Sequence, residues 1–217
     1  MSGQHNPVIT MVDYGGSNLR SVQKAFEAVD IQVRVTDEPE DVRRADRIVL
    51  PGVGAFKAGM DGLRARGLDN SLRAAVTSGI PILGICLGMQ LLFDESEEMG
   101  RHDGLGLLSG RVLKFTPISS QDGGRPLKVP HMGWNQINHD RQHPLLTGVP
   151  SDSHAYFVHS YYCAPDNPAD IMATAEYGRR FAAIVGRGHI MGIQFHPEKS
   201  QSIGLRILHN FARMEMS

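Results

Sequence analysis

Short strand-like runs alternate with helical patterns through the first half of the sequence. Residues 8–12, 31–35, 47–50 and 81–85 are rich in apolar and β-branched side chains and have the length of strands. Between them, as in the stretch after Leu19, apolar residues recur at the 3.6-residue spacing of amphipathic helices. Strands that alternate with helices predict an α/β fold whose central sheet is mostly parallel and covered by helices on both faces.

The second half of the sequence has a different pattern of secondary-structure signals. Several strand-like segments, among them residues 155–162, follow one another with short gaps and few helical patterns, which predicts a strand-rich and partly antiparallel region. A final helix is expected over residues 202–213. Because no repeat or linker is visible, we interpret residues 1–217 as a single domain.

Charge and hydropathy exclude several classes of protein. The 22 basic and 23 acidic residues nearly cancel, so the chain lacks the positive field that attracts nucleic acid. The longest apolar stretch, residues 80–93, is interrupted by Pro81 and is shorter than the roughly 20 residues that span a bilayer. The sequence shows no basic segment followed by an apolar core, which is the pattern of a secretory signal peptide. We therefore expect a cytoplasmic protein with no nucleic-acid or membrane partner and two free thiols.

The segment GICLGMQ contains the strongest candidate for a catalytic residue. Cys86 stands between Gly84 and Gly88 where a buried strand meets an expected helix, the pattern of a nucleophile elbow. A helix N-terminus favours the thiolate, and Gln90 would lie one turn further along the same face. The alternative is a buried structural cysteine, since free cysteines are usually inert, and this is our interpretation of Cys163.

A base and a group to orient it are present in QFHPEKS. His196 and Glu198 are two residues apart, and Pro197 favours extended backbone before it, so both side chains can lie on one side of the chain. Together with Cys86 they would form a catalytic triad. The alternative interpretation is a strand that ends at proline with exposed polar residues.

The turn PGVGAF could complete such a site. Gly52 and Gly54 follow a buried strand, and their backbone N–H groups could stabilise an oxyanion together with the amide that follows Cys86. The segment lacks the GK[ST] of a phosphate-binding loop. The GxGxxG pattern of a dinucleotide-binding site is also not found in the sequence. We expect no cofactor and no metal site, because the remaining histidines lack the spacing of metal ligands: His131, His139, His143, His154 and His159.

With GICLGMQ, PGVGAF and QFHPEKS in this order, the chain resembles the class I, triad-type glutamine amidotransferases over essentially its whole length. The resemblance implies a flavodoxin-like fold and a catalytic triad of Cys86, His196 and Glu198.

Four further segments are similar to one branch of that family, the glutaminase subunits of imidazole glycerol phosphate synthase. They are residues 13–22, 51–56, 128–135 and 155–162. This resemblance implies that the chain hydrolyses glutamine and passes the ammonia to a cyclase subunit. That partner makes imidazole glycerol phosphate and the aminoimidazole carboxamide ribonucleotide in histidine biosynthesis.

The same resemblance implies roles for individual residues. Those expected at the oxyanion hole are Gly52, Val53, Gly54 and Leu87. Those expected to contact glutamine are Gln90, Glu98, Ser160 and Tyr161, with Glu95 and Glu97 close enough to Glu98 to be alternatives. Those expected at the interface with the cyclase are Lys199 and Trp134.

Other functions remain open at this point. The chain could serve another ammonia-dependent synthase or act as a stand-alone cysteine hydrolase with the same triad. It could also be a non-catalytic binding module in which Cys86 is a redox or structural thiol.

Overall fold

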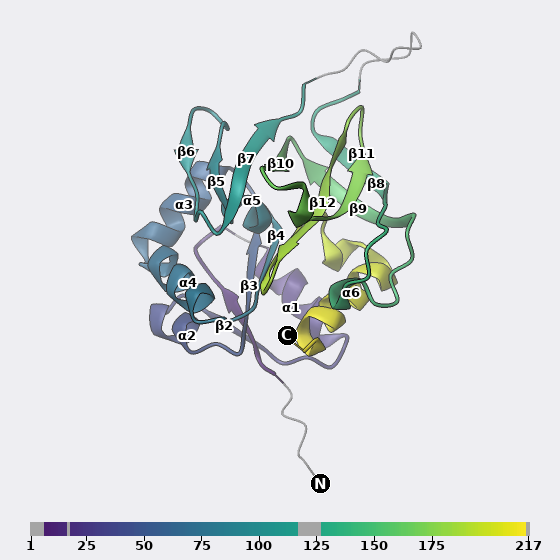
Figure 1. Ribbon diagram of the computed structural model, residues 1–217. Coiled ribbons are helices and arrows are strands. Elements are labelled where there is room, and N and C mark those ends of the chain that lie inside the picture. The colour runs from purple at the N-terminus through teal and green to yellow at the C-terminus, as the bar shows by residue number, and fades with distance from the viewer. Residues whose placement is uncertain (1–6, 17, 117–126, 216–217) are drawn as a thin grey trace.

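A mostly parallel sheet forms the centre of the molecule (Figure 1). The computed structural model describes residues 7–16, 18–116 and 127–215. The sheet has seven strands in the order β11-β12-β13-β4-β3-β1-β2, in which β11 and β12 are antiparallel to their neighbours and the other strands are parallel. Its strands are β1 (Ile9–Val12), β2 (Val33–Thr36), β3 (Arg47–Gly52), β4 (Ile82–Cys86), β11 (Ile171–Glu176), β12 (Arg180–Arg187) and β13 (Ile190–Ile193).

Helices cover both faces of this sheet, as the alternating pattern predicts. Alternate residues of the central strands enter two separate apolar cores, one on each face. Helices α1 (Leu19–Glu27) and α6 (Gln201–Arg213) pack on one core. The other core is covered by α2 (Pro39–Arg43), α3 (Phe56–Ala65), α4 (Leu68–Thr77) and the short α5 (Leu87–Leu91).

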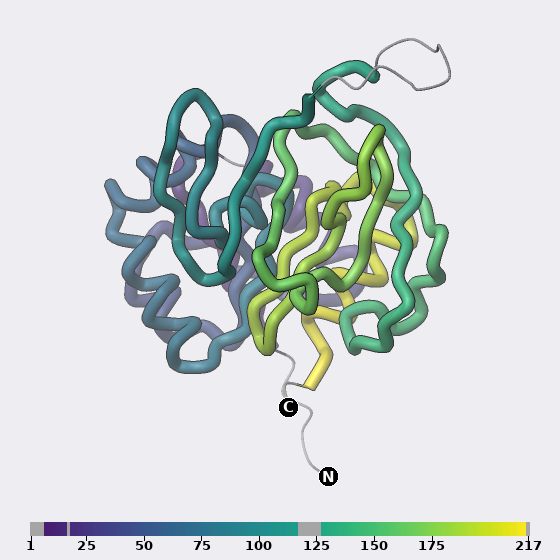
Figure 2. Tube along the Cα trace, turned by 45° about the horizontal axis from the view of Figure 1, so that its top comes forward, coloured from purple at the N-terminus to yellow at the C-terminus, as the bar shows by residue number. Residues whose placement is uncertain are grey.

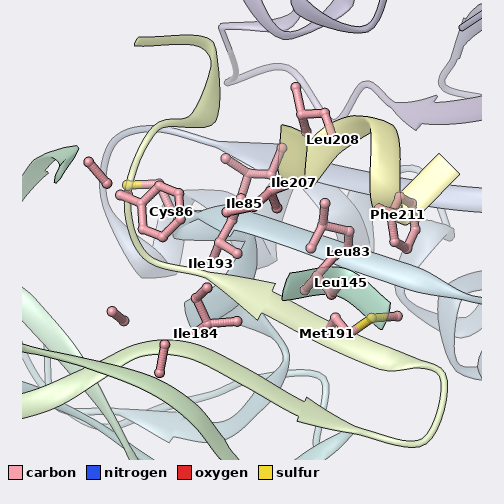
Figure 3. Packing of buried hydrophobic residues seen from close by; sticks show 14 of the residues in the cluster. Leu83, Ile85, Cys86, Leu145, Ile184, Met191, Ile193, Ile207, Leu208 and Phe211 are labelled. Atoms are coloured by element: carbon pink, nitrogen blue, oxygen red, sulfur yellow. The ribbon is translucent and has the colours of Figure 1, made fainter. Parts of the chain in front are cut away.

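Strand β4 ends in Cys86 and packs against the core that α6 covers. Leu83 and Ile85 face α6, where Ile207 and Leu208 are fully buried against them, and Cys86 lies at the end of the same strand (Figure 3). Burial of a leucine or isoleucine side chain of this kind stabilises a fold by about 1.5 to 3 kcal/mol. The strand that ends in Cys86 is therefore rigidly placed.

The strand-rich half forms a second sheet and a hairpin. The four-stranded sheet has the order β10-β7-β5-β6, and β8 pairs with β9. Figure 2 shows the green segments of this half on one side of the molecule and the blue segment of helices α3 and α4 on the other, with the teal segment of β5 to β7 beside those helices. The strands are β5 (Phe93–Ser96), β6 (His102–Asp103), β7 (Leu108–Lys114), β8 (His131–Ile137), β9 (Ser153–His159) and β10 (Tyr161–Pro165). Three 3₁₀ turns are η1 (Pro144–Leu146), η2 (Pro168–Asp170) and η3 (Pro197–Lys199).

The expectation of one continuous strand over residues 155–162 is wrong. The chain breaks at Ser160, so that β9 pairs with β8 while β10 pairs with β7. The Ser160 carbonyl accepts a hydrogen bond from the Phe115 amide at 2.9 Å, at the point where the chain passes between the two sheets. This crossing brings Ser160 and Tyr161 close to the end of β4.

Within the part of the chain that the structure describes, no helix is long and apolar enough to cross a bilayer. The same residues contain no group of three or more histidine, cysteine or carboxylate side chains arranged to hold a metal ion.

Candidate active site

Cys86 occupies the turn between β4 and α5. Its φ of 53° lies in the left-handed region, which costs a non-glycine residue on the order of 1 kcal/mol or more and which the surrounding packing must sustain. The flanking glycines make the turn possible. A Cβ at Gly88 would lie 1.7 Å from the Leu50 carbonyl oxygen, and one at Gly84 would lie 2.6 Å from the Gly88 oxygen. The GxCxG pattern is therefore a steric requirement of this turn.

The imidazole of His196 is held by a buried carboxylate. His196 follows β13 and directly precedes η3, and its Nδ1 lies 2.8 Å from Oε1 of Glu198. Their side chains are only 4% and 2% exposed. Asn18 donates a second hydrogen bond to the same carboxylate oxygen at 3.4 Å. Because a carboxylate accepts, Nδ1 carries the proton and Nε2 is left without a hydrogen-bond partner among the described residues.

The electrostatics of the site keep His196 protonated. Burial lowers the pKa of the imidazole, but its interactions with Cys86 and Glu198 outweigh burial and raise the pKa from 6.5 to about 9. An imidazolium at the cavity can donate a proton to a leaving group. The pair can thus provide both a nucleophile and a proton donor.

This pKa shift predicts how stability depends on pH. Between pH 6.5 and 9 the folded protein binds a proton on His196 that the unfolded chain has lost, so this contribution to stability disappears as the pH rises through that range. We expect the free energy of unfolding to fall by at most about 1.4 kcal/mol per pH unit from this group, and by about 3 kcal/mol in total. Urea unfolding across the range measures the slope, and His196→Asn should lack this fall. The same pH dependence in both proteins would contradict the assignment.

A cavity of about 330 Å³ is lined by both Cys86 and His196. Its volume suits a small metabolite of the size of an amino acid. It brings together residues that are far apart in the sequence, and nearly all of the predicted site residues reach it: Val53, Gly54, Cys86, Leu87, Gln90, Glu98, Ser160, Tyr161, His196 and Lys199, together with Pro130, Val158 and His159. Three predicted residues do not line it. Gly52 and Glu198 lie behind the wall, and Trp134 lies outside with its side chain 48% exposed.

Of the three neighbouring glutamates, Glu98 is the one that lines the cavity. Its Oε2 accepts a hydrogen bond from the Phe56 amide at the start of α3, at 2.6 Å. Glu95 pairs with Arg101 instead, and Glu97 accepts from the backbone amide of Lys114. The three carboxylates therefore have different partners, and only that of Glu98 reaches the cavity.

Sequence reasoning missed two buried polar side chains near Cys86. Gln194 is fully buried, and its Nε2 lies 3.8 Å from the sulfur of Cys86. In the sequence, Gln194 could have been noticed as a polar residue directly after an apolar strand and two positions before His196. Tyr14 is also buried, with its hydroxyl unpartnered among the described residues, and burial followed by the charge of Cys86 raises its pKa.

Comparisons with known proteins agree with this geometry. The family model described as glutamine amidotransferase class-I matches residues 10–214. The imidazole glycerol phosphate synthase subunit HisH of Syntrophotalea carbinolica is 55% identical, over 95% of this chain and 100% of its own length. The HisH subunit of Methylococcus capsulatus is 50% identical, over 95% of this chain and 96% of its own length.

Solved structures support the fold. A structure of PurLQS from Thermotoga maritima aligns with a TM-score of 0.71 at 19% identity and covers 95% of this chain and 97% of that chain. A crystal structure of a glutamine amidotransferase from the same organism aligns with a TM-score of 0.63 at 16% identity, covering 89% of this chain and 77% of that chain. The predicted α/β fold is confirmed.

Proposed function

The chain belongs to the class-I glutamine amidotransferases, and within them to the family of imidazole glycerol phosphate synthase HisH subunits, and on this premise we propose how its residues carry the reaction. The substrate is glutamine, the products are glutamate and ammonia, and the ammonia passes to the cyclase subunit of the synthase. The cyclase uses it to make imidazole glycerol phosphate and the aminoimidazole carboxamide ribonucleotide in histidine biosynthesis. The observation that carries the proposal is the meeting of Cys86 with the His196–Glu198 pair at one cavity.

The reaction begins with attack by sulfur on the carboxamide carbon of glutamine. The Cys86 thiolate forms the C–S bond while the carbonyl becomes an oxyanion. His196, holding a proton on Nε2, gives it to the leaving nitrogen as the C–N bond breaks, so ammonia departs and a glutamyl thioester remains. His196 then takes a proton from water, which attacks the thioester and releases glutamate and the thiolate. Glu198 keeps the imidazole in the correct orientation through both steps.

Backbone amides near the sulfur stabilise the oxyanion in this proposal. Leu87 is the first residue of α5, and Val53 and Gly54 line the cavity directly after β3. Gly52 supports this loop from behind, where a Cβ would lie 2.2 Å from the Tyr14 hydroxyl. One such donor contributes about 3 kcal/mol to a transition state of this kind.

Polar groups across the cavity would hold the rest of the substrate. The Nε2 of Gln90 already donates to the Tyr161 carbonyl and to Gln194, each at 3.2 Å, so its Oε1 is the atom available to accept an N–H of glutamine. Glu98 supplies a negative charge for the ammonium group of the substrate. Ser160 and Tyr161 line the same wall.

The partner is proposed to dock on the face that surrounds the mouth of this cavity. Met132 and Trp134 project outward from β8, with exposed fractions of 62% and 48%. The Trp134 ring lies 6.0 Å from the ring of Tyr156, and the ammonium of Lys199 lies 5.6 Å from the centre of that ring. Val53, at the cavity, is also exposed. Exposed aromatic and apolar side chains gathered in this way are typical of protein interfaces.

Both cysteines are free thiols, which fits a reducing compartment, and we place the complex in the cytoplasm.

Release of glutamate from glutamine tests the function directly. We expect slow turnover by the isolated chain and strong stimulation by the cyclase subunit with its nucleotide ligand bound. Reorientation of the loop that carries Val53 would produce this stimulation. Full turnover by the isolated chain would favour a stand-alone hydrolase over an ammonia-delivering subunit.

Trp134 provides a test of the docking face. Trp134→Ala should weaken binding of the cyclase about 10-fold or more, because a half-buried aromatic side chain at the centre of an interface contributes about 1.5 kcal/mol or more. Calorimetric titration measures the dissociation constant. Val35→Ala, at a similarly exposed valine on β2, should leave it unchanged. Equal affinity of the wild type and Trp134→Ala would place the interface elsewhere.

A further inference from the structure

Buried side chains form a continuous series of hydrogen bonds that starts at the nucleophile. Nε2 of Gln194 lies 3.8 Å from the sulfur of Cys86, and Oε1 of Gln194 accepts from Nε2 of Gln90 at 3.2 Å. The same Gln90 nitrogen donates to the Tyr161 carbonyl at 3.2 Å. Both glutamine side chains are buried, which is unusual for this residue type, and each polar group here depends on its neighbour.

The series continues through two histidines to the β8–β9 hairpin. The Tyr161 carbonyl also lies 2.8 Å from Nδ1 of His159, whose Nε2 lies 3.1 Å from Nδ1 of His131. Nε2 of His131 lies 3.3 Å from the side-chain nitrogen of Asn135, which also donates to the Glu176 carbonyl at 2.8 Å. Asn135 is the residue next to Trp134 on β8.

The acceptor at one end, the Tyr161 carbonyl, and the donor at the other, the Asn135 amide nitrogen, fix every proton in the histidine pair. A carbonyl can only accept, so His159 carries its proton on Nδ1 and its Nε2 is an acceptor. His131 must then donate from Nδ1, which leaves its Nε2 to accept from the Asn135 amide. Both rings are neutral in this arrangement, and burial lowers the pKa of His159 to about 3 and of His131 to about 4.

Aromatic rings enclose the pair and keep other partners away. The His131 ring stacks between Tyr177 and Phe157, at centroid distances of 4.1 and 5.0 Å. The Phe115 ring packs edge-on against His159 at 5.3 Å. A buried polar group without a hydrogen-bond partner is energetically costly, so removal of one member of the series also destabilises the arrangement of its neighbour.

We propose that Gln194, His159 and His131 are positioning residues, which together with Gln90 and Asn135 form one hydrogen-bonded chain that ties the nucleophile and the substrate-binding amide to the β8–β9 hairpin. The chain fixes the orientation of the Gln90 amide and of the Tyr161 carbonyl, and it ends on the strand that presents Trp134. The inference rests on the proposed function for the roles of Cys86, Gln90 and Trp134, but the bonding pattern does not depend on activity.

The first experiment reads the protons directly in the full-length protein. In a sample with ¹⁵N-labelled histidine at pH 7, His131 and His159 should both be neutral with the proton on Nδ1. Their signals are assigned by their disappearance in His131→Phe and His159→Phe, and His102→Phe on β6 serves as a control that removes neither. A charged ring or an Nε2–H form at either position would overturn the chain, whether or not the protein hydrolyses glutamine.

The second experiment separates positioning from simple structural support. His131→Phe keeps a ring in the stack but removes the donor, and should raise KM for glutamine about 10-fold in the complex with the cyclase, with little change in kcat. His131→Asn restores an N–H near the Nδ1 position and should recover most of the wild-type KM. Thermal unfolding checks that both variants are folded. If His131→Asn then failed to recover the wild-type KM, the two histidines would contribute only to packing and not to positioning.

Coupling along the chain is tested by combining its two distant members. Gln194→Met should lower kcat/KM about 100-fold, since it removes the amide contact to the Cys86 sulfur and one of the two acceptors that hold the Gln90 side chain. With His131→Phe added, the combined loss should be clearly smaller than the product of the two single losses. A multiplicative loss would mean that the two residues act independently. If the wild-type complex itself hydrolyses no glutamine, the proposed function fails, and the rate of Cys86 alkylation in the same variants takes the place of activity in the cycle.

Discussion

Alanine in place of Cys86 is expected to abolish glutamate release, with a loss on the order of 10⁴-fold or more in kcat. Ser160, Tyr161 and Lys199 also line the cavity, but among the described residues none of their side chains forms a hydrogen bond with His196 that could activate it, and the oxyanion donors alone give only weak catalysis. The fold should survive, because the substitution removes one sulfur atom from a turn that the flanking glycines define. Synthesis driven by added ammonia in the complex should also survive.

Cys163 provides the matched control for this variant. It is the other cysteine, fully buried in β10, and burial raises the pKa of its thiol well above the usual range. Cys163→Ala should keep glutamine hydrolysis within a few-fold of the wild type, and iodoacetamide should label Cys86 alone. Substantial turnover in Cys86→Ala would remove the thiolate from the mechanism and return this residue to a structural role.

The part of the site that could be predicted from the sequence is the part that local sterics impose. No other residue fits at Gly84 or Gly88, because any Cβ there would overlap backbone atoms. This requirement is visible in the sequence as the five-residue pattern GxCxG. His196 and Glu198 are likewise close in sequence, so that one proline and a two-residue spacing suffice to bring their side chains together.

The parts that sequence analysis missed depend on strand register. His131 and His159 are 28 positions apart and meet only because β8 and β9 pair them directly, so spacing alone presented them as scattered histidines. The choice of Glu98 over its neighbours depends on the pairing of β5 with β7 and on the start of α3. No pattern within a single segment contains that information.

Helix α3 was missed for a different reason. Gly59 and Gly62 lie inside it, and glycine disfavours helix by about 1 kcal/mol relative to alanine. Tertiary contact overrides this preference: a Cβ at Gly62 would lie 2.4 Å from the Tyr14 carbonyl oxygen, and one at Gly59 would press against Leu91 of α5. The two glycines allow α3 to approach the loop after β1 and the helix that follows the nucleophile. Asn18 immediately precedes α1, but its side chain makes no capping hydrogen bond and donates to Glu198 instead.

Glutamine in place of Glu198 is expected to lower kcat by about 10³- to 10⁴-fold while the site keeps its shape. The carboxylate accepts from Nδ1 of His196 and fixes the tautomer that leaves Nε2 facing the reaction. An amide at this position can donate instead, which favours the wrong tautomer. It also removes the negative charge that helps to raise the His196 pKa, so the pKa should fall and less imidazolium should be present at neutral pH to protonate ammonia.

Two further variants separate these effects. Glu198→Asp retains the charge and should recover part of the activity, whereas Asn18→Ala removes only the long 3.4 Å hydrogen bond to the carboxylate and should cost no more than about 10-fold. Steady-state kinetics with the cyclase subunit measures kcat, and the pH dependence of Cys86 alkylation follows the imidazolium. The backbone also restrains His196, since its amide donates to the Tyr156 carbonyl at 2.9 Å. If Glu198→Gln retained kcat within 10-fold, this backbone contact would be sufficient to orient the imidazole, and the carboxylate would be a structural partner of Asn18 rather than a member of the triad.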